Sequence, residues 1–312
     1  MTALPARDAI VATAGESIAR GSKSFAAASR LFAPAVRERA WLLYAWCRRC
    51  DDLADGQDHG HDTTPVADPN ARLAGIRERT AAALNGQWVG DAAFDALRIV
   101  VGETGIPQRL VWDVVEGFAL DAAGWRPASE ADLMRYCYHV AGAVGCMMAV
   151  VMGVRPDDDA LLDQACDLGL GFQLANIARD LGEDAEAGRC YLPADWLAEA
   201  GIAPDAVTAD REKLAALAAR LCAMAEAYEA SARRGTPALG FRSAWAVLAA
   251  TGIYGDIARA VEARGPAAWD RRVSTSAGAK LGWIARAFGE ARLRVRLYPP
   301  QPRTENLWTR PR

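Results

Sequence analysis

The chain has 312 residues, enough for one large domain or two smaller ones, and 52% of them are hydrophobic, so a sizeable core can form. The net charge of −3 gives no general attraction to nucleic acid, and we expect no nucleic-acid partner. The seven cysteines are scattered through apolar stretches, which indicates reduced thiols in a cytoplasmic protein rather than a disulfide framework.

The N-terminal segment has no long apolar run, because Pro5, Arg7 and Asp8 interrupt it, and no signal peptide is expected. Further along, Ala-rich segments with apolar residues at helical spacing follow one another, while strand signals are few. The spacing predicts helices over 16–30 (interrupted at 21–24), 34–53, 71–84, 92–102, 107–123, 130–152, 157–180, 211–232, 241–263 and 276–297. Residues 56–70 are rich in Gly, Pro, Asp and Thr and form a predicted loop.

This pattern predicts a single all-α domain over residues 1–297 and a Pro- and Arg-rich C-terminal tail, 298–312, that is extended or disordered. The most hydrophobic segment, 140–154, is shorter than the roughly 20 residues that a membrane-spanning helix needs. We therefore expect a buried core helix there, in a soluble or peripheral protein.

A first acidic cluster ends the helix predicted over 34–53. Asp51 and Asp55 are one helical turn apart, and Tyr44 and Arg48 continue the same polar stripe towards the N-terminus. Arg48 could form a plain intrahelical ion pair or offer its planar cation to a phosphate. We favour the phosphate interpretation because of a second cluster further along the chain.

The second cluster places Gln173, Asn176, Asp180 and Asp184 on one face of a helix whose other face is apolar. Stacked carboxylates repel each other unless a cation lies between them. Two such faces brought together would form a cage of hard oxygen ligands that suits Mg²⁺ and a diphosphate. A surface helix rich in acidic residues is the alternative.

Two further patterns lie elsewhere in the chain. Small residues one turn apart in 136–145 normally serve close helix packing, but they can also leave an apolar channel beside the helix. Ser22, Lys23 and Ser24 combine hydroxyl groups with a cation suited to phosphate, although such a patch is often only a helix start.

The segments GSKSFAAASRLF, YAWCRRCDDLAD, RYCYHVAGAVG, FQLANIARDLGEDAEAGRCYLP and RSAWA closely resemble the squalene/phytoene synthase family, and the resemblance covers nearly the whole chain. It implies an all-α isoprenoid synthase (prenyltransferase) fold around a central cavity, with two aspartate-rich helices facing each other across its mouth. By this resemblance, the metal ligands for Mg²⁺, which Mn²⁺ could replace, are Asp51, Asp55, Asn176, Asp180 and Asp184.

The resemblance also implies roles for other side chains. The catalytic residues would be Asp51, Asp55, Asp180, Asp184 and Tyr136, the last near the reacting carbons. The residues that bind the diphosphates of the substrates would be Ser22, Lys23, Ser24, Tyr44, Arg48, Gln173, Arg179 and Tyr254.

The implied activity is the head-to-head (1'-1) condensation of two geranylgeranyl diphosphates, through prephytoene diphosphate, to phytoene in carotenoid biosynthesis. Two diphosphates are released and no NADPH is expected. A C15 synthase that makes dehydrosqualene or squalene from farnesyl diphosphate is the alternative, and the depth of the cavity would separate the two. A catalytically inactive, membrane-associated assembly factor is a further alternative, although such a relative should have lost some of the metal aspartates.

Because the product is a hydrocarbon, we expect a cytoplasmic protein in peripheral contact with the inner face of the membrane. A downstream desaturase is an expected partner. The tail residues Arg303, Arg310 and Arg312 could assist membrane contact, but three arginines are too few for firm anchoring.

Overall fold

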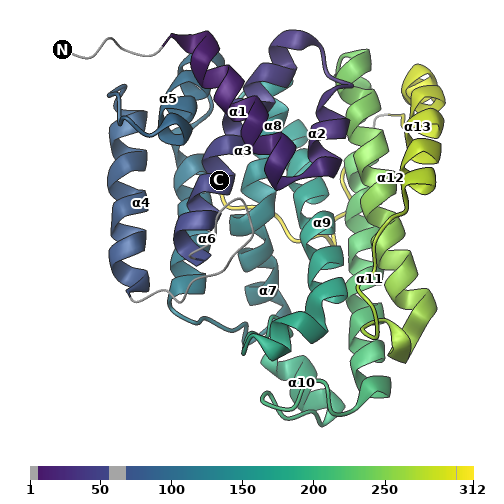
Figure 1. Cartoon of the computed structure of the whole chain (residues 1–312). Helices are drawn as coiled ribbons and strands as arrows, with labels where there is room; N and C mark the ends of the chain where they lie inside the picture. Colours follow the sequence, from purple (N-terminus) through teal and green to yellow (C-terminus); the bar gives the residue numbers. More distant parts are fainter. Residues whose placement is uncertain (1–5, 56–67, 300) are drawn as a thin grey trace. The chain divides into compact units, whose positions relative to one another are not determined.

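The computed structural model describes residues 6–55, 68–299 and 301–312, and within these residues it contains helices and no strand (Figure 1). The α-helices are α1 (Arg7–Gly21), α2 (Lys23–Ser29), α3 (Pro34–Asp55), α4 (Pro69–Leu84), α5 (Ala92–Thr104), α6 (Gln108–Ala122), α7 (Glu130–Cys137), α8 (Ala143–Val151), α9 (Asp159–Glu186), α10 (Ala194–Ala200), α11 (Arg211–Arg233), α12 (Phe241–Arg264) and α13 (Ala277–Leu297). A π-helical turn, η1 (Tyr138–Gly142), joins α7 to α8, and η2 (Thr236–Ala238) and η3 (Gly265–Ala267) are short 3₁₀-helices. The prediction of an all-α fold is confirmed.

Two predicted helices extend well beyond their predicted bounds in the structure. The first begins at Arg7 rather than at residue 16, because Ile10, Val11, Ala14 and Ile18 already form a buried face at helical spacing. The acidic helix α9 continues past Asp180 to Glu186, so one helix carries the whole second cluster. Most of the predicted loop, 56–67, lies outside the described residues.

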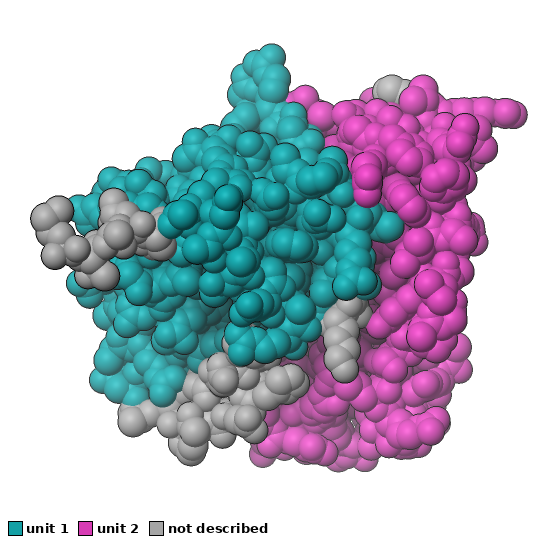
Figure 2. Space-filling model, turned by 45° about the horizontal axis from the view of Figure 1, so that its top comes forward, with its two compact units in different colours: residues 1–123, 147–157 teal, residues 124–146, 158–312 magenta. Residues whose placement is uncertain are grey.

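The internal contacts divide the chain into two compact units, shown in different colours in Figure 2. Unit 1 comprises Met1–Ala123 and Met147–Asp157, and unit 2 comprises Gly124–Cys146 and Asp158–Arg312. In unit 1, α3 packs against α1 and α5, and Leu42, Leu43 and Trp46 of α3 are fully buried in its core.

In unit 2, α9 packs against α11, α12 and η1. Glycines allow the close approach of η1 and α9: a Cβ atom at Gly169 would overlap the carbonyl oxygen of Ala141, and one at Gly142 would lie 2.8 Å from the Sγ atom of Cys166. The small residues of 136–145 therefore serve close helix packing. The interpretation of these glycines as an apolar channel is wrong, because α9 fills the space beside them.

Residues 130–151 are, within the described part of the chain, the one segment long and apolar enough to cross a membrane. In its most apolar window, 61% of the segment is buried inside the structure. A core helix of a soluble protein has this character, which agrees with the expected buried helix.

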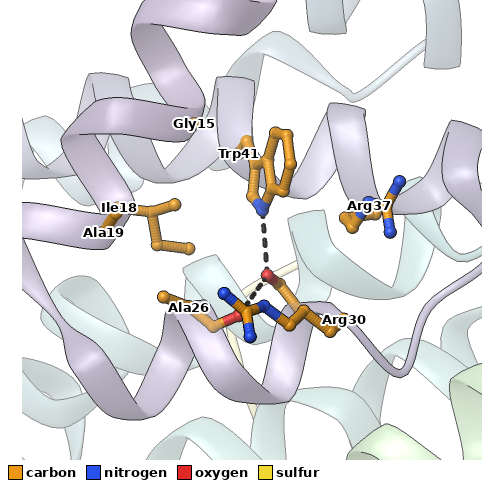
Figure 3. Close-up of a pocket in the computed structure, with 8 residues that line it drawn as sticks. Gly15, Ile18, Ala19, Ala26, Arg30, Arg37 and Trp41 are labelled. Atoms are coloured by element: carbon orange, nitrogen blue, oxygen red, sulfur yellow. Dashed lines mark hydrogen bonds between the residues drawn. The ribbon is translucent and has the colours of Figure 1, made fainter.

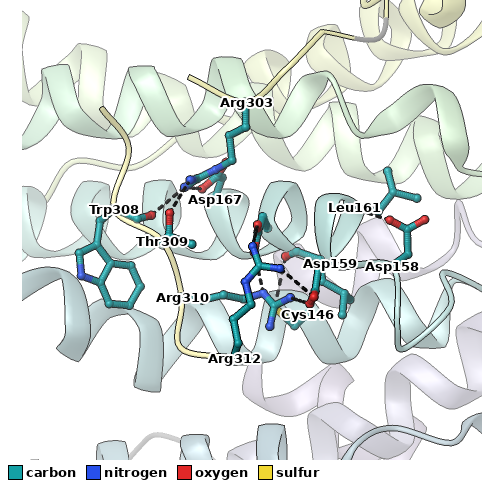
Figure 4. Close-up of polar contacts among 12 residues, drawn as sticks. Cys146, Asp158, Asp159, Leu161, Asp167, Arg303, Trp308, Thr309, Arg310 and Arg312 are labelled. Atoms are coloured by element: carbon teal, nitrogen blue, oxygen red, sulfur yellow. Dashed lines mark hydrogen bonds and ion pairs between the residues drawn. The ribbon is translucent and has the colours of Figure 1, made fainter. Parts of the chain in front are cut away.

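The C-terminal tail, residues 301–312, contains no helix and lies along the N-terminal half of α9 (Figure 4). The Arg303 guanidinium holds both carboxylate oxygens of the fully buried Asp167, at 2.6 and 2.8 Å. Arg310, whose side chain is also fully buried, forms ion pairs with Asp159 and Asp163. Ion pairs within the fold therefore occupy the tail arginines for which a membrane contact was considered.

Candidate active site

The polar stripe of α3 begins with Tyr44 and Arg48. The Arg48 Nε atom donates a hydrogen bond to Asp52 Oδ1 at 2.9 Å, and its guanidinium lies 3.6 Å from Asp51. The structure thus shows the intrahelical ion pair that was the simpler interpretation of Arg48, while a role in binding phosphate stays a prediction. The side chain of Asp55, at the end of α3, lies outside the described residues.

A break between α1 and α2 lies against this stripe. A Cβ atom at Gly21 would be 2.5 Å from the Tyr44 hydroxyl oxygen and 3.3 Å from Arg48 Cδ, so the backbone before Ser22 approaches both side chains closely. Ser22 starts α2, because its hydroxyl accepts a hydrogen bond from the backbone N–H of Phe25 at 3.2 Å. The side chains of Lys23 and Ser24 lie outside the described residues. Unit 1 therefore brings Ser22, Tyr44 and Arg48 together.

Burial raises the pKa of Tyr44 to about 12, so its hydroxyl group keeps its proton at neutral pH. A protonated phenol next to a guanidinium can donate a hydrogen bond to an anionic oxygen. This local chemistry suits a phosphate group.

A cavity of about 470 Å³ lies among α1, α2 and α3 (Figure 3). Its lining residues are Gly15, Ile18, Ala19, Ala26, Ser29, Arg30, Arg37 and Trp41. The Trp41 indole N–H donates a hydrogen bond to the Ser29 hydroxyl at 2.9 Å, which fixes the orientation of the ring. The Arg37 guanidinium lies over the same ring, 5.3 Å from its centre. Apolar walls with cationic groups suit a molecule that combines hydrocarbon with an anion, and no sequence pattern indicated this cavity.

In unit 2, α9 positions Gln173, Asn176, Asp180 and Asp184 at intervals of three and four residues along one face. The Asn176 Oδ1 atom is buried and has no hydrogen-bond partner among the described residues. Burial raises the pKa of Asp184, and the neighbouring Asp180 carboxylate acts in the same direction. The Asn176 side-chain oxygen therefore has no donor, whereas Asp184 accepts a hydrogen bond from Arg189 at 3.3 Å.

Arginines flank the same acidic face. Arg179 forms two hydrogen bonds with the Asp180 carboxylate, at 2.5 and 2.8 Å, and Arg272 approaches its Oδ1 atom to 3.0 Å. Arg272 also forms an ion pair with Glu183, and Arg189 lies 3.3 Å from Asp184. Sequence reasoning missed Arg272, which follows η3. Apart from the neighbouring Arg271, no local sequence pattern indicates that it pairs with an acid of α9.

Tyr254, on α12, lies close to this face. Its ring stacks on Phe172 of α9 with the ring centres 4.1 Å apart. Burial raises the pKa of Tyr254, while the nearby Arg179 acts to lower it. Unit 2 thus brings Tyr254, Arg179 and Asp180 to the same side of α9.

Tyr136 occupies the middle of an aromatic stack. Its ring lies 5.6 Å from that of Trp125 and 4.8 Å from that of Tyr191, with near-parallel planes on both sides. Ser129 and Asp132 form a capping box at the start of α7, and the π-helical turn η1 follows Tyr136 by two residues. Such π-turns are frequent at functional sites, and both faces of the Tyr136 ring are covered by its aromatic neighbours. Sequence reasoning singled out Tyr136 but missed Trp125 and Tyr191.

The donor set of α9 fits a hard divalent cation. Among the described residues, no cluster of three His, Cys, Asp or Glu side chains could hold a metal ion by itself. A cation at α9 would therefore also need ligands from an amide oxygen, water or a substrate. The set of Asn176, Asp180 and Asp184 provides two carboxylates and one amide oxygen, and the amide oxygen is orphaned. Mg²⁺ is typically held by one or two carboxylates together with substrate phosphates and water, so these residues fit Mg²⁺ bound with a diphosphate.

Comparison with known proteins decides the family. The profile described as Squalene/phytoene synthase matches residues 18–279, which is most of the chain. The chain belongs to this family. Among members of the squalene/phytoene synthase family, a phytoene synthase from Pseudescherichia vulneris is 47% identical over 302 residues, with 96% of this chain and 97% of the relative covered. A 15-cis-phytoene synthase from Paracoccus sp. is 46% identical, with 97% of this chain and 98% of the relative covered.

Solved structures of the family share the fold. A dehydrosqualene synthase in complex with a ligand superposes with a TM-score of 0.80 at 26% identity, with 92% of this chain and 98% of that chain covered. A squalene synthase from Alicyclobacillus acidocaldarius gives a TM-score of 0.70 at 23% identity, with 82% and 95% covered. The expected isoprenoid synthase fold is confirmed.

Proposed function

We propose that this protein is a phytoene synthase, which condenses two geranylgeranyl diphosphates head to head, through prephytoene diphosphate, to phytoene in carotenoid biosynthesis. The observation that carries the proposal is the identity of 45–47% to phytoene synthases over 95–97% of this chain. Each half of the reaction releases one diphosphate and one proton, and neither half needs a reductant. Squalene synthesis differs in requiring hydride.

We propose that Mg²⁺ is the cofactor, with Mn²⁺ as a substitute, and that Asp51 and Asp55 hold one set of ions and Asn176, Asp180 and Asp184 another. When bound, the ions supply Lewis-acid stabilisation of the departing diphosphate. The orphaned Asn176 oxygen and the raised pKa of Asp184 support this assignment for the second set.

The protein's own side chains have three tasks in this reaction. Lys23, Arg48 and Arg179 bind diphosphate oxygens and stabilise the charge that develops as each diphosphate leaves. Ser22, Ser24, Tyr44, Gln173 and Tyr254 orient the diphosphates by hydrogen bonds. Tyr136, held between two aromatic rings, lies near the reacting carbons, and apolar walls exclude the water that would quench the allylic cation.

Aspartate substitutions test these roles. Asp51→Asn and Asp180→Asn should each lower kcat at least about 100-fold, because each removes charge needed in the transition state. Asp8→Asn is the matched control, since Asp8 is an exposed acid on α1, and its activity should equal that of the parent protein. Activity of Asp180→Asn within twofold of the parent would refute the assignment.

A C15 head-to-head synthase is the second candidate, and the structural similarity to a dehydrosqualene synthase favours it over other reactions. Farnesyl diphosphate would then give a C30 product. A failure of both substrates, in detergent and with Mg²⁺ present, would instead support a catalytically inactive assembly factor.

We also propose a cytoplasmic enzyme in peripheral contact with the inner membrane surface, which passes its product to a desaturase. The support is chemical: phytoene is a hydrocarbon with negligible solubility in water, and it carries the saturated links on which a desaturase acts.

A further inference from the structure

Exposed apolar side chains concentrate on α13. Of the seven large apolar residues that the described part of the chain exposes, five belong to this helix: Leu281, Phe288, Leu293, Val295 and Leu297. Leu281 is 68% exposed and Val295 is 65% exposed. Large apolar side chains that concentrate on the exposed surface of one helix can mark an interaction surface.

The periodicity of α13 aligns these residues. Leu281, Phe288 and Val295 are seven positions apart and lie along one side of the helix. Ala287 and Ala291 are buried on the adjacent side of this helix, which packs against α12 (Figure 1). The indole N–H of Trp283 donates a hydrogen bond to Asp256 of α12, and that of Trp245 donates to the carbonyl of Ile284. These bonds fix which side of α13 faces outward.

The outward side has open space around it. A Cβ atom added at Gly278, Gly282 or Gly289 would meet nothing within 4 Å. These glycines are four and seven residues apart, so they lie on one side of the helix, next to Leu281 and Phe288. The outward side of α13 is therefore smooth and has no neighbouring side chain over its glycines.

The charge of α13 is strongly positive. The helix carries Lys280, Arg286, Arg292, Arg294 and Arg296 against a single acid, Glu290. Glu290 lies 3.1 Å from Arg233 of α11 and also accepts a hydrogen bond from Tyr298 at 2.9 Å, so it is engaged inside the fold. Arg292 and Arg296 are exposed, and the Arg292 guanidinium lies 5.8 Å from the centre of the Phe288 ring.

We propose, on the basis of the peripheral membrane contact proposed above, that α13 is the element that docks this protein on an anionic lipid bilayer, with Leu281 and Val295 inserted among the lipids and Arg292 and Arg296 at the phosphate groups. A helix of this kind binds at the membrane interface because its apolar side chains are buried among the lipids and its cations are attracted to the anionic headgroups. The Phe288 ring packs edge-on against Phe241 and Trp245 of α12 and anchors the helix to the fold. A second copy of the chain fits less well, because two such helices would bring like charges together. The tail is excluded as the main contact, because Arg303 and Arg310 are ion-paired to α9 (Figure 4).

Vesicle sedimentation with the full-length protein tests this inference. The vesicles contain phosphatidylcholine alone, or phosphatidylcholine and phosphatidylglycerol in equal parts. The parent protein should sediment with the mixed vesicles and weakly with the neutral ones. Arg292→Gln/Arg296→Gln should lower partitioning onto mixed vesicles about 25-fold, since each surface cation contributes about fivefold. Leu281→Gln/Val295→Gln should lower it at least about tenfold.

The matched control is Arg109→Gln/Trp112→Gln, which removes an exposed cation and an exposed apolar ring from α6. It should bind mixed vesicles like the parent protein. All variants should keep the parent activity in detergent, which separates loss of docking from loss of folding or of the proposed function.

Three results would overturn the inference. The α13 variants could bind mixed vesicles as well as the control, the parent protein could bind neither vesicle type, or α13 could mediate self-association. The last would appear in analytical ultracentrifugation as a dimer of the parent protein that Leu281→Gln/Val295→Gln dissociates.

Discussion

The contact between Arg303 and Asp167 should be a major determinant of the stability of unit 2. Asp167 is fully buried on α9, and two of its three polar contacts come from the Arg303 guanidinium; the third is a hydrogen bond of 2.6 Å from Ser231. Arg303 also donates hydrogen bonds to the carbonyl groups of Leu307 and Trp308 and so shapes the tail itself. Arg303→Met keeps the length of the side chain but leaves the carboxylate without a cation.

The substitution lowers the free energy of unfolding because it leaves the buried Asp167 carboxylate without a cation. Removing one partner of a buried ion pair typically costs about 3–5 kcal/mol, and we expect this loss at pH 8. Burial already raises the pKa of Asp167, and loss of Arg303 raises it further. The deficit of the variant against the parent protein therefore grows as the pH rises from the folded pKa of Asp167 in the parent to its higher folded pKa in the variant. At pH 5, where Asp167 of the variant is more fully protonated, the deficit should be smaller than at pH 8.

Urea unfolding followed by circular dichroism measures this deficit at the two pH values. Arg312→Met is the matched control, because Arg312 lies in the same tail and pairs with acids of α9 but is half exposed. Its unfolding midpoint should stay close to that of the parent protein. An equal effect of the Arg303 and Arg312 substitutions, or a deficit for Arg303→Met that does not change with pH, would refute the reasoning.

Two further predictions concern stability. Gly169→Ala should lower the free energy of unfolding by at least about 2 kcal/mol, because its Cβ would overlap the backbone of Ala141. Gly75→Ala, in open space on α4, should raise the free energy of unfolding by about 1 kcal/mol in the same urea titration. Equal effects of the two would contradict the packing argument. Burial raises the pKa of Glu229 from 4.5 to about 7, so the folded state loses about 3 kcal/mol as the pH rises from about 4.5 to 7 and changes little above that. Glu229→Gln should therefore be more stable than the parent protein at pH 8 and equally stable at pH 4.5. A Glu229→Gln variant that is less stable than the parent at pH 8 would show that Arg259 compensates the charge of Glu229.

The sequence predicted the helices well because their signals are local. Apolar residues at helical spacing and the loop-forming residues between them lie within each segment. The stripes of α3 and α9 follow from the same spacing, so the sequence alone places Tyr44 with Arg48 on one helix face and Asn176 with Asp180 on another.

Contacts between distant segments had no such signal. Arg272 reaches Asp180 across 92 residues, and the stack of Trp125, Tyr136 and Tyr191 joins three separate segments. The π-helical turn at 138–142 packs against α9, and no local sequence pattern predicted it.

One missed feature did have a signal. Asp159, Asp163 and Asp167 recur every four residues on α9, which predicts an acidic stripe in need of cations. The tail arginines Arg303 and Arg310 were the available partners, but sequence alone could not pair segments so far apart. The same arginines were therefore interpreted as a surface feature.

The identity of the hydrocarbon product tests the central claim most directly. Purified protein is incubated with Mg²⁺ and either geranylgeranyl or farnesyl diphosphate, without NADPH, and the extracted product is analysed by mass spectrometry. Our account predicts phytoene, a C40 hydrocarbon, from geranylgeranyl diphosphate. A C30 product from farnesyl diphosphate, with none from geranylgeranyl diphosphate, would contradict it.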